Sequence, residues 1–110
     1  MVTYADLASM LNGMKTLNAD IYSNLGDTPR GRECNRRKTI AEIFIEETKG
    51  REGELEARTV RLGLTRRQIA EKLSQRGVRN GNSPYDAKTL KRDIKHFTDR
   101  TGVLYRFSFE

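Results

Sequence analysis

The stretch SPYDAKTLKRDIKHF, residues 83–97, decides the fold because its pattern predicts a helix with two different faces. Leu90, Ile94 and Phe97 recur at three- and four-residue spacing, which is typical of the buried side of an amphipathic helix. The rest of the helix surface carries four cations, Lys88, Lys91, Arg92 and Lys95. We therefore expect a helix over about residues 87–98 that packs onto a core and presents positive charge to solvent.

A second helix is predicted just before it, in LTRRQIAEKL, residues 64–73. Thr65 and Gln68 fit the capping box, in which each side chain accepts a hydrogen bond from the other residue's backbone N–H. Its apolar side consists of Ile69, Ala70 and Leu73. The small side chain of Ala70 allows a second helix to cross closely. A polar turn, SQRGVRNGNSPYD, separates the two helices, and its last residue, Asp86, is a suitable N-cap.

The tail VLYRFSFE, residues 103–110, predicts a strand with one apolar face. Along it, Leu104, Arg106 and Ser108 alternate with Tyr105, Phe107 and Phe109. Helix, polar turn, basic helix and strand is the order of a winged helix-turn-helix, a mainly α fold with a small C-terminal β wing. In such a fold the basic helix enters the major groove of DNA, where Arg and Lys reach guanine edges and phosphates.

Residues 1–57 are expected to form a helical region in front of the winged helix-turn-helix region, which we place at residues 58–110. Short helices are predicted at Tyr4–Leu11, after a Thr3 N-cap, and at Thr16–Leu25. KTLNADI in the first region parallels KTLKRDI in the second. The echo indicates either a degenerate second helix-turn-helix, which would pack or dimerise because it lacks the cations, or a chance similarity of two small helices.

The middle of the chain is expected to begin with a loop, GDTPRGRECNRRK, that is rich in Gly, Pro and Arg. Residues 36–48 then form the strongest amphipathic helix of the first region, with Ile40, Ile43 and Phe44 on its apolar side. This helix is the candidate interface of a homodimer that would bind a palindromic site. Its acids Glu42, Glu46 and Glu47 are interpreted as a solvated face. Residues 55–63 fit either a short helix or an extended segment.

Positive charge gathers in the second half of the chain. The net charge is +6, and the isoelectric point is about 9.8. Between Arg58 and Arg106 there are 13 Lys and Arg residues against 4 Asp and Glu, whereas residues 1–57 have 8 against 10. This asymmetry is the expected footprint of a surface that binds a polyanion, and a merely lopsided soluble surface is the alternative.

Composition argues against several other classes of protein. With 110 residues, 35% hydrophobic and 33% charged, we expect one domain with a small core. Cys34 is the only cysteine, which fits a reducing cytosol and excludes an intrachain disulfide. His96 is the only histidine, and no catalytic set or phosphate-binding loop has a recognisable spacing. We expect no enzyme activity, cofactor, metal, secretory signal, membrane span or small-molecule effector, and a cytoplasmic, nucleoid-associated protein.

The two helix segments resemble the DeoR-type winged helix-turn-helix, whose pattern is roughly L-A-x-x-L, a turn, and T-[VIL]-x-R-D-[IL]. Ile69–Leu73 and Thr89–Ile94 match these two blocks. The turn is similar to that of large serine recombinases, where an R-G-[IV]-R stretch lengthens it, as Arg76–Arg79 does here. The resemblance covers about residues 65–107 and implies DNA binding without an effector or recombinase catalytic domain. It also implies an internal role for Asp93, which would brace Arg92 or a neighbouring backbone group.

The expected DNA contacts lie on both helices, the turn and the strand. They are Thr65, Arg66, Arg67 and Gln68; Arg76, Arg79, Asn80, Asn82 and Tyr85; Lys88, Thr89, Lys91, Arg92 and Lys95; and Arg106. The turn residues fit minor-groove or backbone contacts as well as they fit plain loop polarity, and Tyr85 fits a loop anchor equally well.

A second phosphate patch is expected from the run Arg30, Arg32, Arg36, Arg37 and Lys38. Cations at a helix N-terminus oppose the helix macrodipole, so a bound anion would relieve them. The alternative is that these cations simply flank the helix that follows. Together the patterns predict a sequence-specific protein for double-stranded DNA, first a transcriptional regulator and second an accessory factor of a plasmid, phage or integrating element. A protein-binding inhibitor is the alternative from another class.

Overall fold

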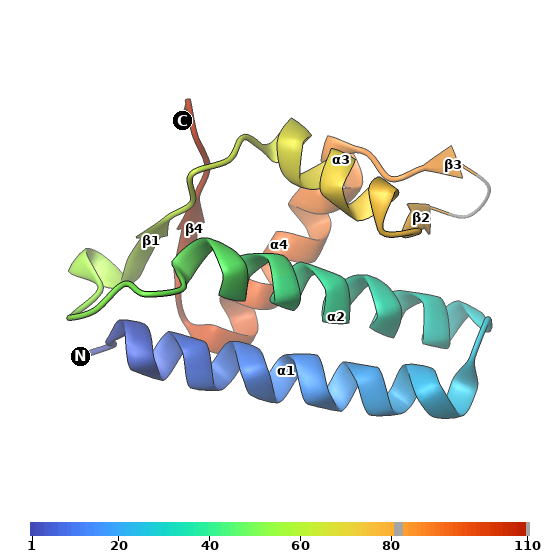
Figure 1. Cartoon of the computed structure of the whole chain (residues 1–110), viewed down its shortest axis with the longest axis horizontal. Helices are drawn as coiled ribbons and strands as arrows, with labels where there is room; N and C mark the ends of the chain where they lie inside the picture. The colour runs from blue at the N-terminus through green and yellow to red at the C-terminus, as the bar shows by residue number, and fades with distance from the viewer. Residues whose placement is uncertain (81–82, 110) are drawn as a thin grey trace.

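Two long antiparallel helices form one layer of the molecule, and a helix pair with two small sheets lies over them (Figure 1). The computed structural model describes residues 1–80 and 83–109, without the side chain of Asn80. The chain is mainly helical, as predicted. No helix among the described residues is both long enough and apolar enough to cross a bilayer.

The first helix, α1, runs unbroken over Tyr4–Leu25. Thr3 caps it as predicted, in a capping box with Asp6. The prediction of two short helices is wrong, because burial of Leu7 and Leu11 against α2 outweighs the cost of about 1 kcal/mol for Gly13 inside a helix. A helix-turn-helix needs a turn, so residues 4–25 do not form a second one.

The second helix, α2, spans Pro29–Thr48 and begins well before the predicted start at residue 36. The Thr28 hydroxyl accepts a hydrogen bond from the Gly31 N–H, and Pro29 occupies the first turn, where a missing N–H costs nothing. A Cβ on Gly31 would lie 2.0 Å from the Gly26 carbonyl oxygen, so the tight α1–α2 connection requires glycine there. The predicted loop is therefore mostly helix.

The predicted apolar face of α2 is confirmed, since Ile40, Ile43 and Phe44 are fully buried. All three belong to the chain's own hydrophobic core. The apolar face of this helix is consequently not available for a contact between two chains. A homodimer through the exposed side of the helix stays a prediction.

Helices α3 (Arg66–Gln75) and α4 (Ala87–Thr101) confirm the two helices predicted from the second half. Both bonds of the capping box are present, from the Thr65 N–H to Gln68 Oε1 at 2.9 Å and from the Gln68 N–H to Thr65 Oγ1 at 3.1 Å. Asp86 accepts the Thr89 N–H at 2.9 Å and so caps α4. The apolar sides of the two helices face each other and are buried, as expected, at Ile69, Leu73, Leu90 and Phe97.

The turn between α3 and α4 contains a short antiparallel hairpin, β2 (Arg79–Asn80) with β3 (Ser83–Pro84). Val78 anchors its base, because its side chain is buried and its N–H donates to the Leu73 carbonyl at 3.0 Å. The sequence indicated a polar turn here but not its strands.

A second small sheet joins a segment that precedes α3 in the chain to a segment that follows α4. After a 3₁₀ turn, η1 (Glu56–Arg58), strand β1 (Thr59–Arg61) pairs in parallel with β4 (Leu104–Arg106). The segment that the sequence left open is therefore extended. The predicted strand at 103–110 is shorter than expected: β4 ends at Arg106, and Phe109 is 98% exposed instead of lying on the apolar face.

The core is continuous across the boundary that we placed between residues 57 and 58. The Phe44 ring of α2 stacks on Tyr105 of β4 at 4.7 Å and meets the edge of Phe97 of α4 at 5.3 Å. Leu7 and Leu11 of α1 belong to the same cluster. The first two helices therefore support the position of α4 directly.

Candidate nucleic-acid interface

The exposed side of α4 carries the predicted row of cations. Successive residues of an α-helix turn by about 100°, which places Lys88, Lys91, Arg92 and Lys95 on one side. All four are exposed, whereas Leu90 and Phe97 on the other side are buried. We name Lys88, Lys91, Arg92 and Lys95 the α4 stripe. Its exposure is as the sequence predicted.

Most of the α4 stripe has no anionic partner within the described part of the chain. Lys95 pairs with Asp99 at 3.1 Å, but Lys88, Lys91 and Arg92 form no ion pair there. The first turn of α4 also has no acidic residue, although anions stabilise helix N-termini and cations destabilise them. Asp86 offsets part of this cost, and its hydrogen bonds from Thr89 lower the pKa of the Asp86 carboxyl. Lys88, in the first turn, is thus placed at a cost in stability.

Two predicted contacts next to the α4 stripe are buried and unavailable to DNA. Thr89 is buried, and its hydroxyl donates to Asp86 Oδ1 at 2.9 Å. Tyr85 is also buried, and its hydroxyl donates to Asp93 Oδ2. The predicted contact of the Thr89 side chain with DNA is therefore wrong. Of the two alternatives for Tyr85, the structure agrees with the loop anchor.

Asp93 holds α4 against the rest of the molecule. Its side chain is 5% exposed and accepts from Arg36 Nε of α2 at 3.3 Å as well as from Tyr85. Burial, followed by the charge of Asp93, raises the pKa of Tyr85, so the hydroxyl stays protonated and donates. The expected internal role of Asp93 is present, but its ionic partner is Arg36 and not Arg92. One buried acid thereby joins α2, the turn and α4.

Among the four contacts predicted at the start of α3, the Arg67 side chain is 89% exposed and is the one without a structural role in the helix start. Thr65 and Gln68 are engaged in the capping box. The Arg66 guanidinium lies over the Phe107 ring at 5.0 Å. Arg67 Nε lies 3.8 Å from Glu71 in an exposed pair, which holds it only weakly. Arg67 therefore remains a candidate contact.

The turn arginines have different environments. Arg76 pairs with Glu46 at 2.9 Å and with Glu42 at 3.7 Å, so it ties the end of α3 to α2. Glu47 accepts the Gly63 N–H at 3.1 Å, so the acidic side of α2 makes tertiary contacts and is not merely solvated. Arg79 is exposed. The Asn80 side chain and Asn82 lie outside the described residues.

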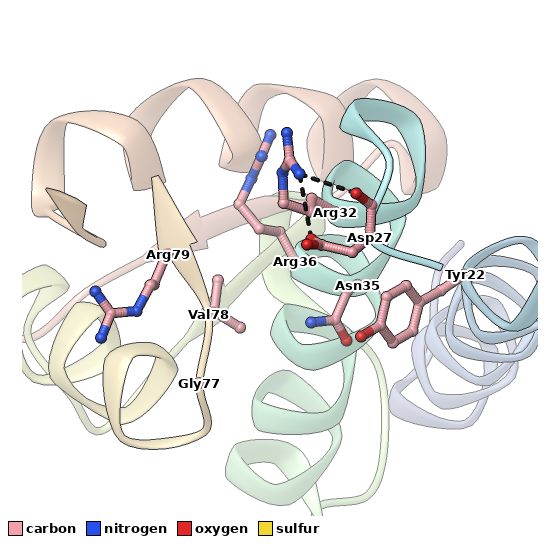
Figure 2. Close-up of a pocket in the computed structure, with 8 residues that line it drawn as sticks. All are labelled: Tyr22, Asp27, Arg32, Asn35, Arg36, Gly77, Val78 and Arg79. Atoms are coloured by element: carbon pink, nitrogen blue, oxygen red, sulfur yellow. Dashed lines mark hydrogen bonds and ion pairs between the residues drawn. The ribbon is translucent and has the colours of Figure 1, made fainter. Parts of the chain in front are cut away.

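The expected second phosphate patch does not form one surface. Arg30 and Arg37 both pair with Glu33, and Lys38 lies 3.9 Å from Glu42. Arg32 and Arg36 instead lie on another face of α2, and together with Arg79 of the turn after α3 they line one cavity (Figure 2). This second grouping could not be predicted from the sequence, because Arg79 is far from the other two residues along the chain.

The remaining candidate, Arg106, lies away from the α4 stripe. Arg106 on β4 borders a recess shared with Arg51, Glu54 and Arg61, on the other side of the molecule from the β2–β3 hairpin (Figure 1). Arg106 and the turn after α3 therefore lie in different parts of the structure, and their joint contact with DNA stays a prediction. His96 is partly buried, and burial followed by nearby Arg37 and Arg100 lowers its pKa.

No cluster of three or more potential metal-ligating side chains occurs in residues 1–80 and 83–109. Comparison of the chain with protein-family models, curated proteins and solved structures gives no match.

Proposed function

We propose that this chain binds double-stranded DNA in a sequence-specific manner through α4, in the manner of a winged helix-turn-helix recognition helix. The observation that carries the proposal is the division of α4 into a buried apolar side and an exposed cationic side. The major groove is about 12 Å wide and admits one α-helix, and Lys and Arg are the residues that contact guanine edges and phosphates there.

The attachment of α4 supports this role. A reading helix must hold its side chains at fixed positions relative to the base edges. Here the buried Asp93 joins α4 to Arg36 of α2 and to Tyr85 of the turn. Phe97 adds an aromatic contact to Phe44 of α2. The helix is consequently held on a rigid base while the α4 stripe faces solvent.

The structure also reduces the expected set of contacts. Lys88, Lys91, Arg92 and Lys95 would read the groove, and Arg67 and Arg79 would contact the backbone. Strand β4 would take the place of the wing, but it pairs in parallel with β1 and its Arg106 lies away from α4, so we give it no DNA contact. Regulation of transcription is the proposed role, and an accessory role on a mobile element would use the same contacts.

The direct test is selection of bound duplexes from a random pool, followed by the double substitution Lys91→Ala with Arg92→Ala. We expect the native chain to select a defined motif. The double variant should lose the preference for that motif and weaken its binding by about 1–3 kcal/mol, the value of one good bidentate base contact. Its urea unfolding curve should be unchanged, because both side chains are exposed.

The matched control removes the same charge elsewhere, with Lys49→Ala and Arg61→Ala, both exposed and outside α4. It should keep the selected motif. Affinity of the native chain should also fall steeply with salt, because each neutralised phosphate contributes about −0.9 to the slope of log K against log salt. Recovery of no motif, or a preference that survives in the α4 variant, would reject α4 as the reading surface. Flat salt dependence would favour a protein-binding inhibitor.

A further inference from the structure

A polar cavity lies where the α1–α2 connection, the first turns of α2 and the turn after α3 meet (Figure 2). Its volume is about 330 Å³, which is at the lower end of the range for small-ligand sites. The lining residues are Tyr22, Asp27, Arg32, Asn35, Arg36, Gly77, Val78 and Arg79. Three of them are arginines, so the cavity has the charge expected of an anion site.

Two of the arginines converge from one helix. Arg32 and Arg36 are four residues apart on α2, a spacing that places side chains on the same face. Figure 2 shows both side chains extending in the same direction. Two like charges at this spacing repel each other, and Arg32 lies in the first turns of α2, where the helix dipole adds positive potential. An anion between them would relieve both effects.

The donors needed for such an anion are largely available. Arg36 uses Nε for Asp93, and its two terminal amino groups have no hydrogen-bond partner among the described residues. Arg79 is exposed, and its guanidinium likewise makes no hydrogen bond or ion pair within residues 1–80 and 83–109. Because a guanidinium has five donors in a planar fork, it suits the oxygens of a phosphate.

A carboxylate already occupies part of the cavity. Arg32 Nη1 donates to Asp27 Oδ1 at 3.2 Å and to the Asp27 carbonyl at 3.1 Å (Figure 2). The Asp27 side chain is 88% exposed, so it can move aside without disturbing the core. We interpret the Asp27 carboxylate as an internal anion that competes with an external anion for the Arg32 guanidinium.

We propose that this cavity binds a phosphate group, held by the Arg32 and Arg36 guanidiniums, with Arg79 of β2 lining the edge of the cavity. Arg36 also bonds Asp93 of α4, so one residue of the cavity is joined directly to the helix that carries the α4 stripe. A backbone phosphate of bound DNA and a free phosphorylated compound offer the same chemistry. The assignment of the phosphate to the DNA backbone rests on the proposed function, whereas the binding of a phosphate group by the cavity does not.

The first arm of the test is titration with inorganic phosphate at constant ionic strength, with chloride as the reference, followed by backbone amide NMR. Phosphate should shift the amides of Asn35, Gly77 and Val78. Arg32→Gln with Arg79→Gln should weaken phosphate binding about tenfold, because charge-assisted hydrogen bonds are lost. Asp27→Asn should strengthen it. Arg30→Gln, an exposed arginine on the same helix but outside the cavity, is the matched control and should change nothing.

The second arm measures the salt slope of duplex binding. If the phosphate belongs to DNA, Arg32→Gln with Arg79→Gln lowers the slope by about one to two, and Arg30→Gln leaves it unchanged. If phosphate binds but the slope does not change, the ligand is a free phosphorylated compound. Lys91→Ala with Arg92→Ala should keep phosphate binding even where DNA binding is lost. Absence of amide shifts, or equal effects of Arg30→Gln and the double variant, overturns the site whatever α4 does.

Discussion

Asp93→Ala is expected to lower the free energy of unfolding by about 3–5 kcal/mol, because it breaks a buried ion pair by removing one partner. The Arg36 side chain is 15% exposed and donates to Asp93 through Nε. The buried Tyr85 hydroxyl also donates to Asp93. The substitution leaves a guanidinium and a hydroxyl without this acceptor, and an unsatisfied buried polar group costs about 1–3 kcal/mol or more.

Urea unfolding measures the free energy lost in Asp93→Ala, and two other variants serve for comparison. Asp99→Ala, on the same helix, removes an acid that is 61% exposed and pairs with Lys95. It should cost less than about 1 kcal/mol, as exposed ion pairs do. The triple variant Arg36→Met, Tyr85→Phe and Asp93→Leu removes all three polar groups together and should be close to the native stability. If Asp93→Ala costs no more than Asp99→Ala, Asp93 does not hold α4 in place.

The features that sequence reasoning predicted correctly are encoded over three or four residues. The capping box of Thr65 and Gln68, the Asp86 cap and the two faces of α4 are all present. Each depends on residues that are close in the chain and on helix geometry alone. The elements around the α4 stripe were predictable for this reason.

The helix ends in the first half were predicted poorly because opposing local signals compete there. Gly13 and the run of Gly, Pro and Arg after residue 25 indicate interruptions, and α1 nevertheless continues through Gly13. Packing between two long helices supplies the stability that the local sequence lacks. The Thr28–Pro29 pair is a recognisable helix start, and reading it as one would have placed α2 correctly.

The roles of individual cations were not accessible from the sequence, because their partners are distant in it. Arg36 and Asp93 are 57 residues apart, and Arg76 and Glu46 are 30 apart. A count of charges treats all four as surface groups. The fold pairs them, and it leaves Lys88, Lys91 and Arg92 as cations without an ion pair in the described chain. Tertiary pairing therefore separates cations that stabilise the fold, such as Arg76, from exposed cations such as those of the α4 stripe.

Phe44→Ala is expected to reduce stability by about 3–5 kcal/mol, the usual cost of deleting a buried phenylalanine ring. The Phe44 ring is fully buried between Tyr105 at 4.7 Å and Phe97 at 5.3 Å. Its removal would leave a cavity where α2, α4 and β4 meet. A domain of this size is stable by about 5–15 kcal/mol, so the loss is a large fraction of the total.

Thermal and urea unfolding measure this loss, with Leu17→Ala as the control on a side chain from α1 that is 55% exposed. The control should change stability by about 0.5 kcal/mol or less. Phe44→Ala should also weaken DNA binding when temperature or urea unfolds part of the protein, and a stabilising temperature should restore it. Lys91→Ala with Arg92→Ala should behave in the opposite way. This variant should lose DNA binding at every temperature, while its unfolding curve stays the same as that of the native chain. If Phe44→Ala leaves stability near the native value, α2, α4 and β4 do not share one core.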